Sequence, residues 1–325
     1  MTTRSELLQR LADGALHSGA DLGRRLGISR AAVSKAIKSL NADGIVVHAL
    51  ASRGYQLDAP LTLLDKRRLA SHLRELGVSA KLEILEQIDS TNRYLATQIT
   101  SVADPNGHVC LAEMQPQGRG RRGKSWIATP YQNLMLSMSW CFAGGPATLA
   151  GLSLAAGVAI ANALERFGVR DVGLKWPNDV LWRERKLAGL LIDIQGEASG
   201  PCTAILGVGV NCRIAAAEAE RIDQAWTDIH TITNATPDRN RLAAFLIDEL
   251  HKMFVDFERT GLSGFRDEWR RRHVHAGKRV RVWQGEMVYD GVAEDIDDNG
   301  ALWISDGQGQ RKLFHSGDVS LRPTS

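Results

Sequence analysis

Hydrophobic and polar residues follow three different patterns along the chain, and the changes between the patterns suggest three segments. Residues 4–12 place Leu7, Leu8 and Leu11 at helical spacing. Farther along, apolar runs of strand length alternate with helical stretches as far as His273, and from residue 276 short runs with alternating faces take over. We therefore predict three domains, covering residues 1–60, 61–273 and 274–325.

The first segment has the pattern of a winged helix-turn-helix. Residues 21–26 suit a short helix, Gly27 suits the turn that ends it, and Ser29 suits the N-cap of the next helix. The apolar face of that second helix consists of Val33, Ile37 and Leu40. Residues 44–57 suit two short strands around Ser52-Arg53-Gly54, which would form the wing.

In this layout the second helix enters the major groove of DNA. The predicted DNA-binding residues are Ser29, Arg30, Ser34, Lys35, Lys38 and Arg53. The alternative is a small helical bundle with a solvated basic face, and the short helix, glycine turn and capped basic helix together favour DNA binding.

The second segment has the pattern of one mixed α/β sheet. The predicted strands are residues 109–115, 134–142, 172–176, 186–196 and 202–212, and the predicted helices are 149–167, 240–257 and 264–272. Several β-rich runs with helices interspersed favour a mixed sheet over a strict βαβ array.

The third segment has the pattern of a small β domain. The predicted strands are residues 278–283, 287–296, 301–306 and 311–321, and Asp298-Asn299-Gly300 is a strong hairpin turn. About fifty residues of β-meander predict an SH3-like barrel.

Composition and charge narrow the function classes. The net charge of +3 is too small to indicate nucleic-acid binding by itself, so such binding must come from a local element. The four cysteines, Cys110, Cys141, Cys202 and Cys212, have no metal-ligand spacing and suit buried or free thiols in a reducing compartment, and we predict no protein metal site.

The expected location is the cytoplasm, without a membrane partner. No apolar leader follows Met1. The most apolar run, residues 149–164, is short for a membrane span and is interrupted by Ser153, Gly157 and Asn162, which favours a buried helix.

The stretch QPQGRGRRGKSW, residues 115–126, carries the strongest chemical signal. Alternating glycine and arginine cannot bury itself, but glycine lets backbone amides approach an anion and arginine grips carboxylates and phosphates bidentately. An RNA-binding tract would normally repeat and contain aromatic residues. A single copy between two apolar strands favours an active-site loop over a nucleic-acid patch or a linker.

Four other short stretches could accompany this loop. Residues 90–92 are Ser-Thr-Asn, residues 175–179 are KWPND, residues 185–189 are RKLAG and residues 207–211 are GVGVN. Taken singly, each has an ordinary structural explanation, namely an N-cap, a turn, a solvated lysine and a strand-end cap.

Taken together and in this order, these stretches resemble the bifunctional biotin protein ligases and biotin operon repressors of bacteria. The matching stretches are DSTN (89–92), AEMQPQGRGRRGKSW (112–126), NLMLSMSW (133–140), GLSLAAGVAIANAL (151–164), KWPNDV (175–180), RKLAGLLID (185–193), GVGVN (207–211) and SLRP (320–323). The helix-turn-helix stretch matches as well, so the resemblance covers nearly the whole chain.

The resemblance implies a multidomain α+β fold, with a winged helix-turn-helix, a catalytic domain of the biotin/lipoyl ligase type and a C-terminal SH3-like barrel. It implies a biotin–[acetyl-CoA-carboxylase] ligase that uses ATP and Mg²⁺ to make biotinyl-5'-AMP. The biotin is then transferred to a lysine of the biotin carboxyl carrier protein. The adenylate would also act as corepressor, promoting a homodimer that binds operator DNA.

The resemblance also implies roles for individual residues. The implied catalytic residues are Arg121, Lys186 and Asp179. The implied biotin-binding residues are Ser90, Thr91, Asn92, Gln115, Arg119, Gly120, Arg121 and Lys186, and the implied adenylate-binding residues are Gly118, Arg122, Trp126, Asn178 and Asn211. The basic loop would then be a mobile lid over the adenylate.

Two alternatives stay open from the residues alone. One is a ligand-sensing DNA-binding repressor without ligase turnover, and the other is a lipoyl-type ligase that forms an acyl-adenylate. Retention of Arg121, Lys186 and Asp179 argues against the first, and the intact GRGRRG and KWPND stretches favour biotin over lipoate.

Overall fold

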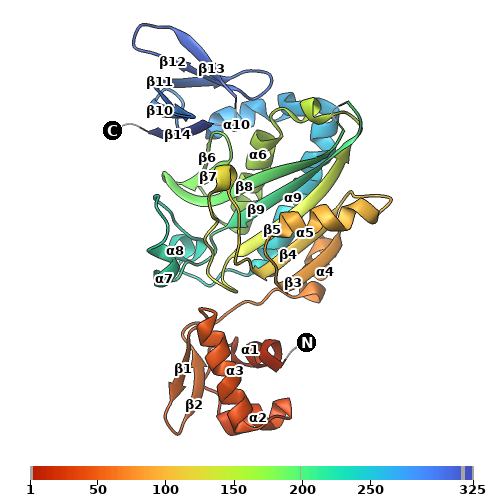
Figure 1. Ribbon diagram of the computed structural model, residues 1–325, viewed down its shortest axis with the longest axis vertical. Helices are drawn as coiled ribbons and strands as arrows, with labels where there is room; N and C mark the ends of the chain where they lie inside the picture. The colour runs from red at the N-terminus through yellow and green to blue at the C-terminus, as the bar shows by residue number, and fades with distance from the viewer. Residues whose placement is uncertain (1–2, 198, 316–318, 324–325) are drawn as a thin grey trace.

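The computed structural model describes residues 3–197, 199–315 and 319–323. Figure 1 shows three parts along the long axis of the molecule: a helical part at the N-terminal end, a central part built on one sheet, and a β part at the C-terminal end. The central part carries helices on both faces of its sheet.

The N-terminal part is a winged helix-turn-helix, as predicted. It consists of α1 (Thr3–Leu11), α2 (Gly19–Leu26), α3 (Arg30–Ala42) and an antiparallel hairpin of β1 (Val47–Leu50) and β2 (Gly54–Leu57). Gly27 ends α2 with a φ of 66°, and the Ser29 hydroxyl caps α3 by accepting the Ala32 N–H at 3.2 Å. The three apolar residues predicted for one face of α3 are buried in its core.

The central part is built on a seven-stranded mixed sheet. Its order is β3 (Lys81–Gln87), β4 (His108–Met114), β5 (Leu134–Phe142), β9 (Cys202–Val210), β8 (Arg185–Gly196), β7 (Asp179–Trp182) and β6 (Val172–Lys175). The β3–β4 pair is parallel and the other neighbouring pairs are antiparallel. The predicted mixed sheet is therefore confirmed.

Helices pack on both faces of this sheet. One face carries α6 (Leu152–Phe167) and α9 (Arg239–Thr260), with α4 (Lys66–Glu75) against α9 and α10 (Arg266–Arg272) against α6. The other face carries α5 (Thr91–Gln98) over β4, β5 and β9. By length and composition the stretch 146–167 could cross a membrane, but most of it is buried inside the molecule. It is a core helix, as the interrupted apolar run predicted.

Some central elements differ from the sequence prediction. Helix α6 begins at Leu152 and not at 149, because residues 146–149 form the 3-10 helix η3 and Gly151 follows with a φ of 79°. The remaining short elements are η1 (Ile99–Ser101), η2 (Arg121–Gly123), α7 (Ala216–Ala219), α8 (Ile229–Thr233) and η4 (Gly261–Gly264). Strand β7, the short partner of β6, was also absent from the prediction.

The connection between the first two parts is tied to the central core. Arg239 and Glu113, both buried, form an ion pair at 2.6 Å. The Glu113 carboxylate also accepts the Leu64 N–H at 2.7 Å, and Arg239 Nε donates to the Thr62 carbonyl at 2.9 Å. Residues 62–64 are therefore fastened to the central domain and do not form a free tether.

The C-terminal part is a five-stranded antiparallel sheet of the SH3-like kind. Its order is β13 (Arg311–Phe314), β12 (Leu302–Ser305), β11 (Met287–Ile296), β10 (Arg279–Gln284) and β14 (Val319–Pro323). The run 311–321, predicted as one strand, is two strands. β13 pairs with β12 and β14 pairs with β10, at opposite edges of the sheet, so one strand could not occupy both places.

The predicted hairpin turn at 298–300 joins β11 to β12 and docks this part on the central domain. Gly300 has a φ of 79°, and its carbonyl accepts the Trp176 Nε1–H at 3.0 Å. A Cβ on Gly300 would lie 2.9 Å from Leu154 Cδ1, so glycine permits the close approach. The C-terminal sheet therefore rests directly on the KWPND turn.

Candidate active site

A cavity of about 680 Å³ opens on the face of the sheet that carries α5. The cavity is lined by all the residues for which the resemblance implied a catalytic, biotin-binding or adenylate-binding role: Ser90, Thr91, Asn92, Gln115, Gly118, Arg119, Gly120, Arg121, Arg122, Trp126, Asn178, Asp179, Lys186 and Asn211. Cavities of this size commonly hold cofactor-sized ligands. Segments separated by more than a hundred residues thus converge on one site.

One wall of the cavity is uncharged and polar. Ser90 and Thr91, both buried, start α5, and the Ser90 hydroxyl caps that helix by accepting the Arg93 N–H at 3.5 Å. The Thr91 N–H donates to Gln115 Oε1 at 2.8 Å, which leaves the amide nitrogen of Gln115 for another partner. This wall therefore suits a small polar ring.

The basic loop folds back on itself beside this wall. Gly120 N–H donates to the Lys124 carbonyl at 2.7 Å, and Trp126 N–H donates to the Gly118 carbonyl at 2.8 Å. Arg122 adopts a φ of 56° within η2, which turns the chain at the tip. A Cβ on Gly118 would lie 2.8 Å from the Trp126 carbonyl oxygen, so the glycine there allows the turn to close.

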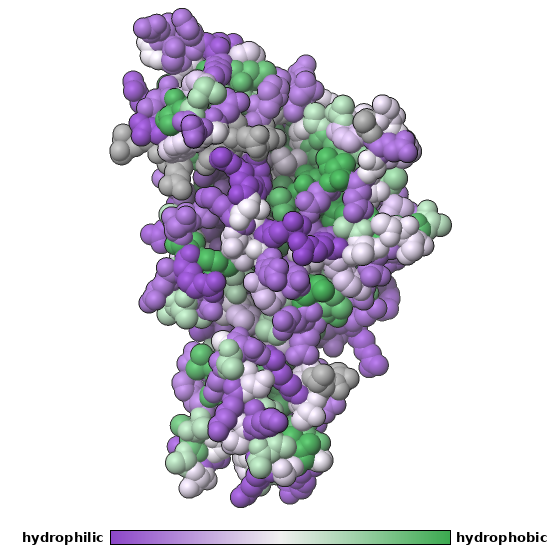
Figure 2. Space-filling view, viewed as in Figure 1, coloured by the Kyte–Doolittle hydropathy of each residue, from purple (hydrophilic) through white to green (hydrophobic). Residues whose placement is uncertain are grey.

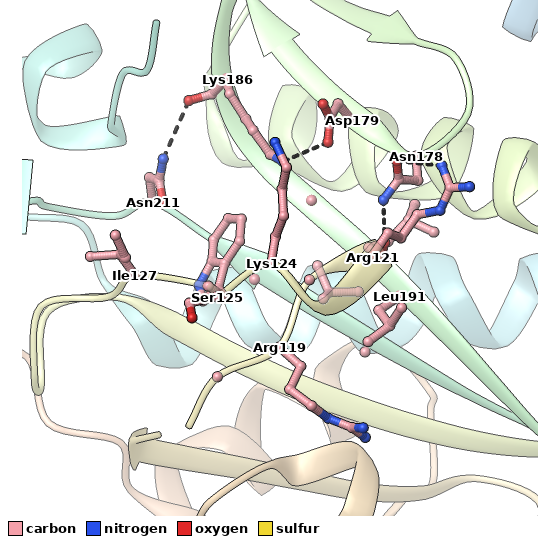
Figure 3. Close-up of a pocket in the computed structure, with 18 of the residues that line it drawn as sticks. Arg119, Arg121, Lys124, Ser125, Ile127, Asn178, Asp179, Lys186, Leu191 and Asn211 are labelled. Carbon is pink, nitrogen blue, oxygen red and sulfur yellow. Dashed lines mark hydrogen bonds and ion pairs between the residues drawn. The ribbon is translucent and has the colours of Figure 1, made fainter. Parts of the chain in front are cut away.

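The two arginines given central roles lie at different places. Arg119 Nη2 is 3.7 Å from Asp193 Oδ2 on β8, whereas Arg121 Nη1 donates a long hydrogen bond of 3.4 Å to Asn178 Oδ1. Figure 3 shows Arg121 beside Asn178 and Arg119 pointing the opposite way. The loop therefore places cationic groups on two sides of the cavity.

The opposite wall carries a cluster of charges. Lys186 Nζ lies 2.6 Å from Asp179 Oδ1, and Lys175 Nζ lies 3.7 Å from Asp179 Oδ2. All three side chains are at most 18% exposed. Two ammonium groups share one carboxylate, so this wall is cationic overall and suits an anionic ligand.

Trp126 lies flat against a glycine floor between these walls. A Cβ on Gly209 would lie 2.4 Å from Trp126 Cε2, and one on Gly189 would lie 3.1 Å from Trp126 Cζ3. Lys186 Nζ is 5.6 Å from the centre of the indole ring. The indole therefore offers a flat surface for stacking next to the cationic cluster.

The side-chain amides of Asn178 and Asn211 donate hydrogen bonds to backbone carbonyls of the protein. Asn178 Nδ2 donates to the Leu190 carbonyl at 2.7 Å, and Asn211 Nδ2 donates to the Thr227 and Lys186 carbonyls at 3.1 and 3.3 Å. The contact between Asn211 and the Lys186 carbonyl is visible in Figure 3. Both residues hold strands together at the cavity edge.

Sequence reasoning passed over several lining or supporting residues. Lys175 was part of the quoted KWPND motif, so its signal was present in the sequence. Ser137 and Asp193 contact Asn92 only because of the strand register and the packing of α5, which no local pattern contains. Arg221 and Trp226, which also line the cavity, come from irregular structure after β9.

The cysteines do not contribute a nucleophile. Burial raises the pKa of the Cys110 and Cys212 thiols to about 12, and burial also raises the pKa of Cys202. A thiol that stays protonated is a poor nucleophile, so the prediction of buried, inert thiols holds for these three.

The predicted DNA-facing residues lie together on the N-terminal part. Ser29, Arg30, Lys35, Lys38 and Arg53 are exposed, and Ser34 is half-buried. None of the four basic residues among them forms an ion pair with another described residue. Their charges are therefore free to meet phosphates.

Three family descriptions match the chain in the order of its parts. Residues 3–56 match an HTH domain, residues 84–211 match the biotin/lipoate A/B protein ligase family, and residues 275–322 match the biotin protein ligase C terminal domain.

Curated relatives match along nearly the whole chain. The bifunctional ligase/repressor BirA of Salmonella typhimurium is 38% identical over 97% of this chain and 96% of its own. The protein of the same name from Escherichia coli is 36% identical over 99% of this chain and 98% of its own. The biotin–[acetyl-CoA-carboxylase] ligase of Mycobacterium tuberculosis is 37% identical over 79% of this chain and 95% of its own.

A solved structure shares the fold. The biotin protein ligase from Aquifex aeolicus in complex with biotin and ATP superposes with a TM-score of 0.63 and 25% identity, over 75% of this chain and 99% of that one.

Proposed function

This chain belongs to the family of bifunctional biotin ligase/repressors, and we propose how its residues divide the two tasks. It is an ATP-dependent biotin protein ligase with a DNA-binding repressor domain. In the first step the biotin carboxylate attacks the α-phosphorus of ATP, forming biotinyl-5'-AMP and releasing pyrophosphate. In the second step a lysine amine of the acceptor attacks the acyl carbon and AMP leaves.

One observation supports the proposed roles: a single cavity has two different walls. One wall is uncharged and polar, with Ser90, Thr91 and Gln115, and the other is cationic, with Lys175 and Lys186 around Asp179. The ureido head of biotin, with one carbonyl and two N–H groups, suits the first wall. The carboxylate and the α-phosphate suit the second. Biotin then extends across the sheet between the two walls.

We place the ureido head against Ser90, Thr91 and Gln115. Under the rest of the ligand lie the apolar residues Met135 and Leu191 of the lining, which share the cavity face of the sheet with Ser137 and Gly207. Asn92 has its amide engaged with protein groups, and therefore we assign it to positioning this wall and not to direct contact.

At the other wall, Lys186 would neutralise the reacting carboxylate and phosphate. Negative charge spreads onto phosphate oxygens as the first step proceeds, and fixed cations stabilise it without reorganising. Arg121 and Arg122 would close over the mixed anhydride and keep water away, with Gly118, Arg119 and Gly120 shaping the loop around it. Trp126 would stack on adenine, with Asn178 and Asn211 holding the surrounding strands.

Asp179 would serve the second step. The acceptor lysine must lose a proton before it attacks, and a carboxylate nearby can orient it and take that proton. The Asp179 carboxylate lies 2.6 Å from Lys186 Nζ. If Lys186 turns to the adenylate, Asp179 keeps the more distant Lys175, 3.7 Å away, and its Oδ1 can meet the incoming amine.

Mg²⁺ would enter with ATP. Within the described residues no group of three histidine, cysteine, aspartate or glutamate side chains could hold a metal, and the one acidic side chain of the cationic wall is paired with lysines. Bound to the phosphates, Mg²⁺ would neutralise charge on the leaving pyrophosphate.

We infer that the acceptor is the biotin carboxyl carrier protein of acetyl-CoA carboxylase and that the chain works in the cytoplasm. We also infer a homodimer when the adenylate is bound. Residues 191–196 of β8 pair only with β9 among the described strands, and Ile194 there is 45% exposed. Figure 2 shows apolar surface over the upper part of the central sheet. An open edge of this kind suits pairing of two copies.

Such a dimer would present two winged helices to a palindromic operator. The exposed Arg30, Lys35 and Lys38 would meet the major groove and its phosphates, and Arg53 on the wing would meet the flanking backbone. Ser29 caps the recognition helix, and Ser34 follows Arg30 by one turn on that helix.

The test is incubation with ATP, Mg²⁺, labelled biotin or labelled lipoate, and an apo carboxyl-carrier domain. Transfer of biotin but not of lipoate supports the ligase. Binding of biotin without adenylate or transfer would favour a sensor, and transfer of lipoate would favour the lipoyl-type alternative. A gel-shift of the region upstream of biotin-synthesis genes, with and without biotin and ATP, tests the repressor half.

A further inference from the structure

Three polar side chains lie directly behind the uncharged wall of the cavity. Ser137 on β5 is fully buried, and its Oγ lies 2.6 Å from Thr91 Oγ1 and 2.6 Å from Asn92 Oδ1. Asn92 Nδ2 in turn lies 2.9 Å from Asp193 Oδ2. These contacts form a chain from β8 through α5 and β5 to the hydroxyl that faces the ligand.

The direction of this chain follows from what each group can do. Asn92 Nδ2 faces the Asp193 carboxylate and also the Leu191 and Ile205 carbonyls, at 3.3 and 3.4 Å. All three accept hydrogen bonds and none donates, so the amide orientation is fixed. Asn92 Oδ1 therefore faces Ser137 as an acceptor.

Ser137 has one hydroxyl proton for two neighbours. A buried carbonyl oxygen left without a donor is costly, so the proton goes to Asn92 Oδ1. The contact of 2.6 Å between Ser137 and Thr91 still needs a proton between the two oxygens. Thr91 supplies it, because its other acceptor, Gln115 Oε1, lies 3.5 Å away and already accepts the Thr91 N–H. The Thr91 hydroxyl thus donates away from the cavity and turns its lone pairs toward it.

The other two groups of the wall have the opposite polarity. Gln115 Oε1 accepts the Thr91 N–H, so the Gln115 amide protons stay available. Ser90 Oγ accepts the Arg93 N–H, so its own proton stays available. The wall therefore offers donors at Gln115 and Ser90 and an acceptor at Thr91.

We propose that Ser137 and Asn92 are positioning residues that fix the Thr91 hydroxyl as an acceptor and so select a ligand ring with N–H donors next to a carbonyl. The inference deepens the proposed function and rests on it, because the ureido ring of biotin carries this pattern and the dithiolane ring of lipoate lacks it. Ser137 stands opposite Gly207 in the β5–β9 register, and a Cβ there would lie 2.3 Å from Asn92 Oδ1. The arrangement therefore also requires that glycine.

The principal test is Ser137→Ala. The Thr91 hydroxyl then loses its fixed acceptor and can turn its proton toward the ligand N–H. We expect the KM for biotin to rise about tenfold, the loss of one well-placed hydrogen bond, while kcat and the KM for ATP stay within about twofold. The preference for biotin over lipoate in kcat/KM should fall by a similar factor.

The same strand supplies a matched control. Ser139 is also fully buried on β5, two residues away and on the same face, and its hydroxyl donates to the Pro105 carbonyl at 2.6 Å, away from the cavity. Ser139→Ala should lower thermal stability about as much as Ser137→Ala and leave the KM for biotin unchanged. A purely structural role for Ser137 would make the two variants behave alike.

A double-mutant cycle tests whether Ser137 acts through Thr91. Thr91→Val removes the acceptor itself, so Ser137→Ala should add little to the KM for biotin in that background. Fully additive effects would overturn the proposal. Should Ser137→Ala fail to fold, Ser137→Cys keeps the shape with a weakly hydrogen-bonding thiol and should give a smaller shift in the same direction.

Failure of this inference differs from failure of the proposed function. If the wild-type protein makes no biotinyl-adenylate, the ligase assignment falls. If the wild-type protein ligates biotin and Ser137→Ala does so with the KM of the Ser139→Ala control, only the role of Ser137 falls.

Discussion

Two buried histidines at the junction of α10 and β10 should make the protein lose stability as the pH falls below neutral. His273 is 7% exposed and its ring stacks on Trp269 with centroids 4.5 Å apart. Burial lowers the pKa of His273 from 6.5 to about 4, and burial lowers the pKa of His275 from 6.5 to about 4 as well. Among the residues that the structure describes, none is a hydrogen-bond partner of His273 Nε2 or His275 Nδ1, which fits neutral rings.

The sign and size follow from linkage between protonation and folding. Above pH 6.5 the histidine is neutral in both states, so its contribution to stability is complete. As the pH falls from 6.5 towards 4, the unfolded chain binds a proton that the folded chain refuses, and stability is lost. At about pH 5, proton binding by His273 favours the unfolded chain over the folded chain by roughly 30-fold. This factor corresponds to a loss of about 2 kcal/mol in the free energy of unfolding for His273 alone.

His273→Phe keeps a ring against Trp269 and removes the titration. Urea denaturation followed by circular dichroism, at about pH 7.5 and about pH 5, measures the free energy of unfolding of both proteins. Other ion pairs titrate equally in both, so they cancel. The wild type should lose about 2 kcal/mol more than the variant between these pH values. Equal losses would refute a neutral buried His273.

Three further outcomes follow from the site and the DNA-binding part. Lys186→Ala should slow biotin-dependent pyrophosphate release by roughly 10²- to 10³-fold, since it removes a fixed cation from the developing charge, and a near-normal rate would exclude its role. Arg121→Gly should let the adenylate escape and label lysines of bystander proteins, and tight retention in that variant would contradict the lid. Lys38→Ala should weaken operator binding and lower the salt-dependence slope by about one, with ligation of the carrier domain unchanged; an unaltered slope would argue against a phosphate contact.

The sequence predicted the elements whose patterns are strong and local. The caps at Ser29 and Gly27 bounded the helix-turn-helix, and the apolar run of β5 matched residue for residue. Helix α4 was missed because it buries only Leu69 and Leu73 among charged residues. Strand β3 was missed because charged and polar residues interrupt its alternation and none of its residues is fully buried.

For the candidate site too, some residues could be predicted from local sequence patterns and others could not. Glycine-rich and motif residues could be found because the loop and KWPND are contiguous in the chain. Ser137 lies inside the matched stretch NLMLSMSW but gives no signal of its own, since it is one small residue inside an apolar strand. Its importance comes from facing Gly207 and Asn92. Asp193 is similar, because only the packing of α5 on the sheet brings Asn92 within 2.9 Å of it. Such contacts depend on strand register and helix placement, which a linear pattern does not encode.

Residues 62–64 are hydrogen-bonded to Glu113 and Arg239, and this affects which spacing of operator half-sites a pair of copies would accept. With a slack tether, each recognition helix could search for its half-site independently, and operators of different lengths would bind about equally. With a stiff connection, the protein itself sets the distance between the two recognition helices of the pair. Each base pair added between half-sites turns them about 34–36° around the duplex axis, so one insertion should already cost binding.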